Sequence, residues 1–204
     1  TLVGIVGSIA WLARSQSSRT SPVSFSSSKT PTTTPVSHPT PHSPPLGTTL
    51  LTYRGHSDGI TDVAWSPDGK YIASAGYAKD KTVQVWNATT GSNSIIYRGH
   101  SDGVIAVTWS PDGTRIASGG DALDRTVQVW SADTGNNTVI YRGHSQWVTS
   151  VAWSPKGTHI ASGSGDNTVQ VFDANTGDNA LTYRGHSSGV DGVDGVAAVA
   201  WSSD

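Results

Sequence analysis

Between residues 50 and 204, short apolar runs alternate with turns built from Ser, Pro, Asp and Gly. The run at 82–86 alternates strongly and places Val83 and Val85 on one face, which is the period of two expected for a β-strand. The Ser-Pro-Asp-Gly turn at 66–69 is compact because Gly tolerates a positive φ. The pattern predicts four antiparallel strands in this first stretch: 60–65, 71–74, 82–86 and 94–97.

The same stretch repeats along the chain. Its opening Tyr-Arg-Gly-His begins at Tyr53, Tyr97, Tyr141 and Tyr183, so successive copies start 44, 44 and 42 residues apart. The first two copies agree at 29 of 44 positions, which indicates tandem duplication. A period of about 40–45 residues, with Gly-His near its start and Trp near its end, is typical of one four-stranded propeller blade. We therefore predict an all-β domain over 50–204, with repeats at 53–96, 97–140, 141–182 and an incomplete one at 183–204.

Single strands are predicted at both ends of the repeats. Residues 50–53 match the fourth strand of a blade, and residues 198–202 match the first strand of a further blade. Three blades and one strand do not close a ring, since propellers have about four to eight blades. We expect the natural protein to continue, and self-assembly to matter only if the chain truly ends at Asp204.

These motifs resemble the WD-repeat (WD40) β-propeller family over residues 50–204. Gly-His, Ser-Pro-Asp-Gly and an Asp six residues before a Trp recur together at fixed spacing. The resemblance implies a hydrogen-bonded structural set of His, Ser, Asp and Trp inside each blade. Its members would be His56, Ser74, Asp80 and Trp86; His100, Ser118, Asp124 and Trp130; and His144, Ser162 and Asp166. Phe172 replaces the third Trp and lacks an indole N–H, so that set should be one hydrogen bond short.

A Ser, a His and an Asp also form the triad of many hydrolases. Here the set recurs in every blade, as a structural network would and an active site would not. The chain has no Cys, and it contains no nucleophile elbow, HExxH motif or phosphate-binding loop. We expect no enzyme activity, no catalytic residue, no cofactor and no metal. The net charge of -2 also gives no reason to expect a nucleic-acid partner.

The copies diverge in two loops, one after Gly-His and one between the second and third strands. By resemblance both loops lie on one rim of the propeller, and a constant scaffold with divergent loops on one face is suited to binding. We expect a protein or peptide partner there. Trp147 stands where the other copies have Gly, and contact with a partner or packing on the neighbouring blade both remain open. The candidate rim residues are Asp58, Asp62, Tyr77, Lys79, Asp102, Ile105, Leu123, Gln146 and Trp147.

The N-terminal part differs in composition. Residues 1–14 are mostly apolar, but the run is shorter than the roughly 20 residues that span a bilayer. The end of a transmembrane helix, the core of a signal peptide and a short buried segment all remain open. Residues 15–49 are rich in Ser, Thr and Pro, and we predict a disordered linker that acts as a stalk.

The tethering sequence and the repeats together resemble bacterial membrane-tethered WD-repeat proteins. We expect a membrane-anchored interaction scaffold with its propeller outside the cytoplasm, although Arg14, Arg19 and Lys29 after the apolar run favour the opposite orientation. The alternative is a sensor or ligand-binding module of a larger membrane signalling protein, such as a bacterial Ser/Thr kinase.

Overall fold

The computed structural model describes residues 48–136, 138–187 and 195–203, without the side chains of 179 and 180. All regular secondary structure in these ranges is β-strand. No helix in them is long and apolar enough to cross a membrane. The predicted apolar segment 1–14 and nearly all of the predicted linker 15–49 lie outside the described residues.

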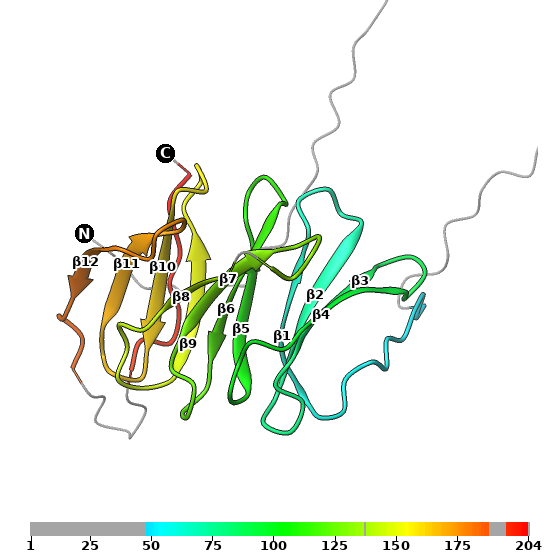
Figure 1. The fold of residues 1–204 in the computed structure, drawn as a ribbon, viewed down its shortest axis with the longest axis horizontal. Helices are drawn as coiled ribbons and strands as arrows, with labels where there is room; N and C mark the ends of the chain where they lie inside the picture. Colours follow the sequence, from blue (N-terminus) through cyan, green and yellow to red (C-terminus); the bar gives the residue numbers. More distant parts are fainter. Residues whose placement is uncertain (1–47, 137, 188–194, 204) are drawn as a thin grey trace, which may run out of the picture. The chain divides into compact units, whose positions relative to one another are not determined.

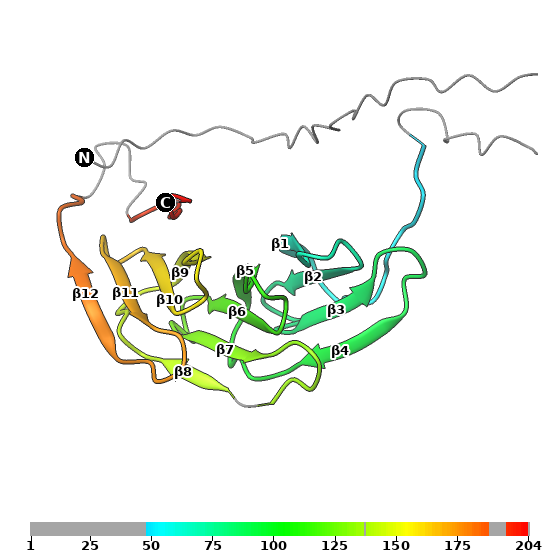
Figure 2. The same ribbon diagram turned by 90° about the horizontal axis from the view of Figure 1, so that it is seen from above.

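The described strands form three four-stranded antiparallel sheets, each a meander in chain order. The all-β, blade-like fold predicted from the sequence is therefore confirmed. Figures 1 and 2 show the three sheets side by side in an arc, with β1, β5 and β9 on its inner edge and β4, β8 and β12 on its outer edge. The strands are β1 (Ile60–Trp65), β2 (Tyr71–Gly76), β3 (Val83–Asn87), β4 (Asn93–Tyr97), β5 (Val104–Trp109), β6 (Arg115–Gly120), β7 (Val127–Ser131), β8 (Val139–Tyr141), β9 (Val148–Trp153), β10 (His159–Ser164), β11 (Val169–Asp173) and β12 (Asn179–Tyr183).

The hydrophobic core lies between neighbouring sheets. Val83 and Val85 of β3 are fully or almost fully buried and belong to one cluster with Val104 and Trp109 of β5. A second cluster joins the second and third sheets in the same way. The alternation that predicted the third strand thus also places Val83 and Val85 on the buried face that packs against the next blade.

The two end segments differ from the prediction. Residues 50–53 and 198–202 are not strands, because the described chain offers neither segment a neighbouring strand to pair with. Both nevertheless take up blade-like positions. Tyr53 stacks on Trp86 at 4.5 Å between ring centroids. Trp201 Nε1 donates to Ala152 O at 3.0 Å, so residues 195–203 mark the start of a fourth sheet.

Candidate functional site

In the first blade, hydrogen bonds join the His, Ser, Asp and Trp of the predicted set. His56 Nδ1 lies 3.0 Å from Asp80 Oδ1, and His56 Nε2 lies 2.7 Å from Ser74 Oγ. Trp86 Nε1 donates to the same hydroxyl at 3.1 Å. One hydroxyl therefore connects the imidazole to the indole, while the carboxylate orients the imidazole from its other side.

The second blade repeats this geometry. His100 Nδ1 lies 3.1 Å from Asp124 Oδ1, and His100 Nε2 lies 2.8 Å from Ser118 Oγ. Trp130 Nε1 donates to Ser118 Oγ at 3.2 Å. Trp130 and Ser118 are both fully buried, so the network lies within the protein interior.

The third blade keeps three of the four members. His144 lies 2.9 Å from Asp166 Oδ2 and 2.8 Å from Ser162 Oγ. Phe172 occupies the fourth position, fully buried, and stacks on Tyr141 at 4.0 Å between centroids. Phe fills the place of the indole but donates nothing to the hydroxyl.

The aspartates of these sets are held as carboxylates. Burial alone would raise the pKa of Asp80, but hydrogen bonds from Thr82, Ser57 and His56 hold it well below its ordinary value. Burial would also raise the pKa of Asp124, but His100, Thr126 and Ser101 lower it by more. Each carboxylate thus ties the loop after Gly-His to the start of the third strand.

The geometry of the sets suits structure rather than chemistry. The three serine hydroxyls are fully buried and bonded to the histidine, so a substrate cannot reach them without opening the blade. In the described residues no group of three or more His, Cys, Asp or Glu side chains could hold a metal ion. The arrangement orients side chains inside each blade.

Sequence reasoning missed a second recurring network. Tyr97 OH donates to Gln128 Oε1 at 2.6 Å, and Gln128 Nε2 donates to Gly99 O at 3.3 Å and to Thr126 Oγ1 at 3.0 Å. It ties the end of one blade to the third strand of the next. The signal was available, because Thr-Val-Gln-Val recurs at the same position in all three complete repeats.

The two divergent loops of each blade are joined to one another. Lys79 N donates to Asp58 Oδ2 at 3.0 Å, and Leu123 N donates to Asp102 Oδ2 at 3.1 Å. In the third blade Gly165 N donates to Trp147 O at 3.0 Å. The loops therefore form one fixed rim, which we call the loop rim and define as residues 57–59 and 77–81 with their counterparts in the next two blades.

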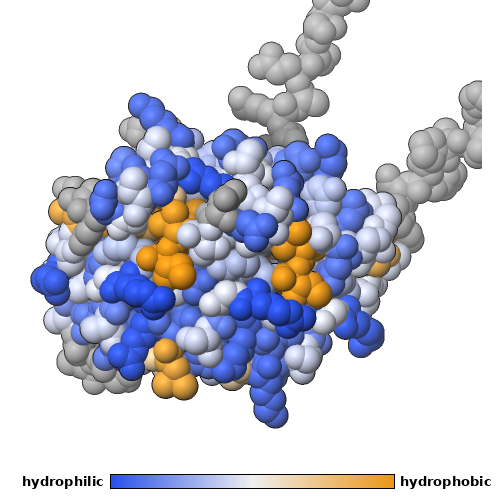
Figure 3. Space-filling view, viewed as in Figure 1, coloured by the Kyte–Doolittle hydropathy of each residue, from blue (hydrophilic) through white to orange (hydrophobic). Residues whose placement is uncertain are grey.

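Side chains of the loop rim are exposed on all three blades. Leu123 is 77% exposed and Tyr77 is 44% exposed, while Lys79 and Gln146 are also exposed. Figure 3 shows that on the face it displays, apolar side chains form small separate patches among hydrophilic ones. Asp58 and Asp102 serve to join the two loops.

Trp147 is half-buried and packs within its own blade. Its ring lies against Gly165, where an added Cβ would approach Trp147 Cε2 to 2.7 Å. The indole N–H makes no hydrogen bond with any described residue. The ring thus covers the second loop of its own blade, and both predicted alternatives, contact with a partner and packing on the neighbouring blade, stay predictions.

Two of the predicted rim residues lie elsewhere. Asp62 and Ile105 belong to the first strands β1 and β5, at the seams between blades. Asp62 Oδ2 accepts from Val107 N of the next blade at 2.9 Å, and burial raises its pKa. The strand at 60–65 was predicted with its observed bounds, but divergence between copies inside that strand was assigned to the loop before it.

Known proteins match the chain in short stretches. The family model described as "WD domain, G-beta repeat" matches residues 47–87, 91–131 and 135–173. The chain is similar to "Protein transport protein sec13" of Emericella nidulans, with 58% identity over 40 residues that make up 18% of this chain and 12% of that protein. It is similar to "Protein HIRA" of Zea mays, with 38% identity over 42 residues, which are 21% of this chain and 4% of that protein. It is also similar to "Ribosome biogenesis protein BOP1 homolog" of Drosophila virilis, with 46% identity over 41 residues, 20% of this chain and 5% of that protein. The chain thus spans only a small part of the length of these relatives.

Proposed function

The chain belongs to the WD40 repeat family, whose members generally act as scaffolds for protein–protein interaction, and we propose that it binds a protein or peptide partner on its loop rim. The observation that carries the proposal is the joining of the two loops in each blade by backbone and carboxylate hydrogen bonds. A fixed frame presents side chains that differ between blades. Such preorganisation lowers the entropy lost when a partner binds.

The side chains on the rim suit a partner of mixed polarity. Tyr77, Leu123 and Trp147 supply apolar contact area from three successive blades, and Lys79 and Gln146 lie beside them as polar groups. Aromatic residues are enriched among the side chains that dominate binding energy. We assign no catalytic step to this surface.

The experiment is quantitative capture of partners from native extracts with rim variants of the chain. Trp147→Gly restores the residue of the other copies, and Leu123→Ser removes the most exposed rim side chain. Each should reduce capture of the specific partner at least roughly tenfold, the equivalent of about 1.4 kcal/mol. Ile96→Ser and Ile140→Ser are matched controls, because both residues are exposed and apolar but lie on the outer strands β4 and β8. Equal loss in rim and control variants would refute the assignment.

We also propose that residues 1–14 tether the protein to a membrane, that residues 15–49 act as a spacer, and that the propeller lies outside the cytoplasm. The support is the apolar run followed by a Ser/Thr/Pro-rich stretch in the sequence. Protease treatment of intact cells is the test. Cleavage of the propeller without lysis supports the proposal, and full protection contradicts it.

The second candidate function is a sensor module of a larger membrane signalling protein, such as a bacterial Ser/Thr kinase. It is favoured by the close similarity of the successive repeats together with the apolar segment ahead of them. The gene sequence before Thr1 separates the two candidates. A kinase domain there supports the sensor, and a short leader supports a free-standing scaffold.

A further inference from the structure

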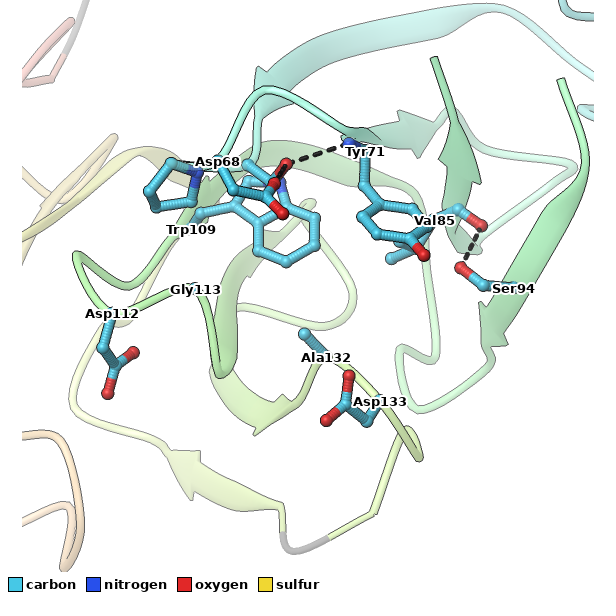
Figure 4. Close-up of a pocket in the computed structure, with 11 residues that line it drawn as sticks. Asp68, Tyr71, Val85, Ser94, Trp109, Asp112, Gly113, Ala132 and Asp133 are labelled. Atoms are coloured by element: carbon cyan, nitrogen blue, oxygen red, sulfur yellow. Dashed lines mark hydrogen bonds between the residues drawn. The ribbon is translucent and has the colours of Figure 1, made fainter. Parts of the chain in front are cut away.

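A cavity of about 310 Å³ lies between the first two blades, at the end of the strands opposite the loop rim. Its size falls within the range of small-ligand pockets, about 300–1,000 Å³. Figure 4 shows Trp109 and Tyr71 on one side of it and Asp112 and Asp133 across from them. The cavity combines an aromatic face with carboxylates, which is the chemistry that attracts a cation.

Between the second and third blades, the positively charged side chain of Arg115 occupies the corresponding place. The Arg115 guanidinium carbon lies 4.8 Å from the centroid of the Trp153 ring. Arg115 also donates to Gly157 O at 3.0 Å, to Ala174 O at 3.1 Å and to Asn175 Oδ1 at 2.8 Å. One side chain of the second blade thus occupies a site built by the third.

The repeat places the same groups around the first cavity. Trp109 and Gly113 stand 44 residues before Trp153 and Gly157, and Ala132 and Asp133 stand 42 residues before Ala174 and Asn175. All four line the cavity. Within the described residues, the carbonyls of Gly113 and Ala132 accept no hydrogen bond, and the Asp133 carboxylate makes none.

The residue that would fill the first cavity is absent. Tyr71 stands 44 residues before Arg115, and its side chain makes no hydrogen bond or ion pair to the second blade within the described residues. The residues around the first cavity are also more negatively charged than those in the next seam, which favours a bound cation. Asp133 replaces the neutral Asn175, and Asp112 replaces Lys156. A hydrogen bond from Ser110 holds the pKa of Asp112 below its ordinary value, so this carboxylate is ionised at neutral pH.

We propose that the cavity between the first two blades binds an arginine side chain of a partner protein, with the guanidinium over Trp109 and its N–H groups donating to Gly113 O, Ala132 O and Asp133. Arginine fits better than lysine because its planar group stacks on an aromatic ring while donating several hydrogen bonds in its plane. Asp68 is already paired with Lys70 at 3.1 Å and is not needed. The site goes beyond the proposed function, since it lies away from the loop rim, and either can fail alone.

The test is residue-resolved NMR titration of the full chain with N-acetyl-arginine N-methylamide. We expect saturable shifts of the Gly113, Ala132 and Asp133 amides with a dissociation constant on the order of 1 mM. The citrulline and lysine analogues should bind at least roughly tenfold more weakly. Absence of saturation, or equal binding by either analogue, would overturn the proposal.

Three variants make the test specific. Tyr71→Arg supplies the missing side chain from within and should abolish binding. Arg115→Tyr should empty the next seam and add a second set of shifts at Gly157 and Ala174. Asp133→Ala changes an exposed turn, leaves the fold intact and should weaken binding at least roughly fivefold. Unchanged binding in Asp133→Ala overturns the proposal even if the other two variants do not fold.

The source of the arginine is tested separately by sedimentation over a dilution series. A monomeric chain at all concentrations supports a partner protein as the source. Self-association that Tyr71→Arg abolishes would assign the arginine to a second copy of this chain and overturn that part of the proposal.

Discussion

A serine hydroxyl at the centre of each blade connects groups that come from different strands. In the second blade, Ser118 Oγ lies between the His100 imidazole and the Trp130 indole. The third blade tolerates Phe at the indole position, so the hydroxyl–indole bond adds stability to a fold that forms without it.

Substituting Trp130 by Phe measures this bond. Trp130→Phe removes the donor to Ser118 and leaves space in a fully buried site, so the free energy of unfolding should fall by about 1–3 kcal/mol. Denaturant unfolding gives the value. The matched control is Trp201→Phe, because that indole is 38% exposed and should cost less. A larger loss in the control would contradict the ranking.

His144 predicts a pH dependence of stability. Burial lowers its pKa below the ordinary 6.5 and outweighs the opposing effect of Asp166. The unfolded chain therefore binds a proton in a pH range where the folded chain does not. The free energy of unfolding should decrease as pH falls from about 7 through 6.5, and His144→Gln should flatten this slope. A slope that is the same in His144→Gln as in the unchanged chain would refute the argument.

At the residue scale, the resemblance to the WD-repeat family predicted which side chains meet in each blade, because the motif of that family recurs in each repeat. It missed the Tyr97–Gln128 bond, whose two partners are separated by 31 positions and come from successive blades. It also misplaced Asp62, since divergence between copies does not distinguish a loop from a seam. Contacts between blades depend on how the sheets pack, which a single repeat does not contain.

The strands themselves followed from alternation and turns, but the seams between them are not equivalent. In the first seam, Thr61 Oγ1 donates to Val104 O and Trp109 Nε1 donates to Ala64 O at 3.1 Å. In the second seam, Ile105 takes the position of Thr61, and Trp153 Nε1 is buried without a hydrogen bond in the described structure. Arg115 bridges that seam instead, with its guanidinium over the Trp153 ring and a hydrogen bond to Gly157 O, so two different sets of polar contacts join similar blades.

The second seam therefore has room for an added hydrogen bond. Ile105→Thr should place a hydroxyl near Val148 O, as Thr61 does with Val104 O in the first seam. We expect Ile105→Thr to be more stable than the isosteric Ile105→Val by about 0.5–1.5 kcal/mol. Thermal unfolding of the two variants is the measurement. If Val is as stable as Thr, the two seams do not share this geometry.

Residues 50–53 and 198–202 show the limit of prediction at the element scale. Their composition suits strands, but a strand needs a partner for its backbone N–H and C=O groups, and the described chain provides none. The side-chain anchors still form, as the Tyr53–Trp86 stacking shows. Local sequence determines the position of such a segment, and pairing determines whether it becomes a strand.

At the scale of the whole molecule, three sheets present two distinct ends. One end is the loop rim, where Tyr77 and Leu123 are exposed on loops joined by hydrogen bonds. The other end contains the turns and the cavity beside Trp109. We expect the loop rim to provide the main protein-binding surface, since its side chains vary while the frame of each blade stays constant.

Site-specific photo-crosslinking tests that claim most directly. A photoreactive amino acid replaces Leu123 on the loop rim in one variant and Ile140 on the outer strand β8 in another, both exposed apolar positions. We predict one dominant crosslinked protein from position 123 in native extracts and none of it from position 140. Crosslinking of the same protein from position 140 alone would contradict the account and move the binding surface to the outer strands.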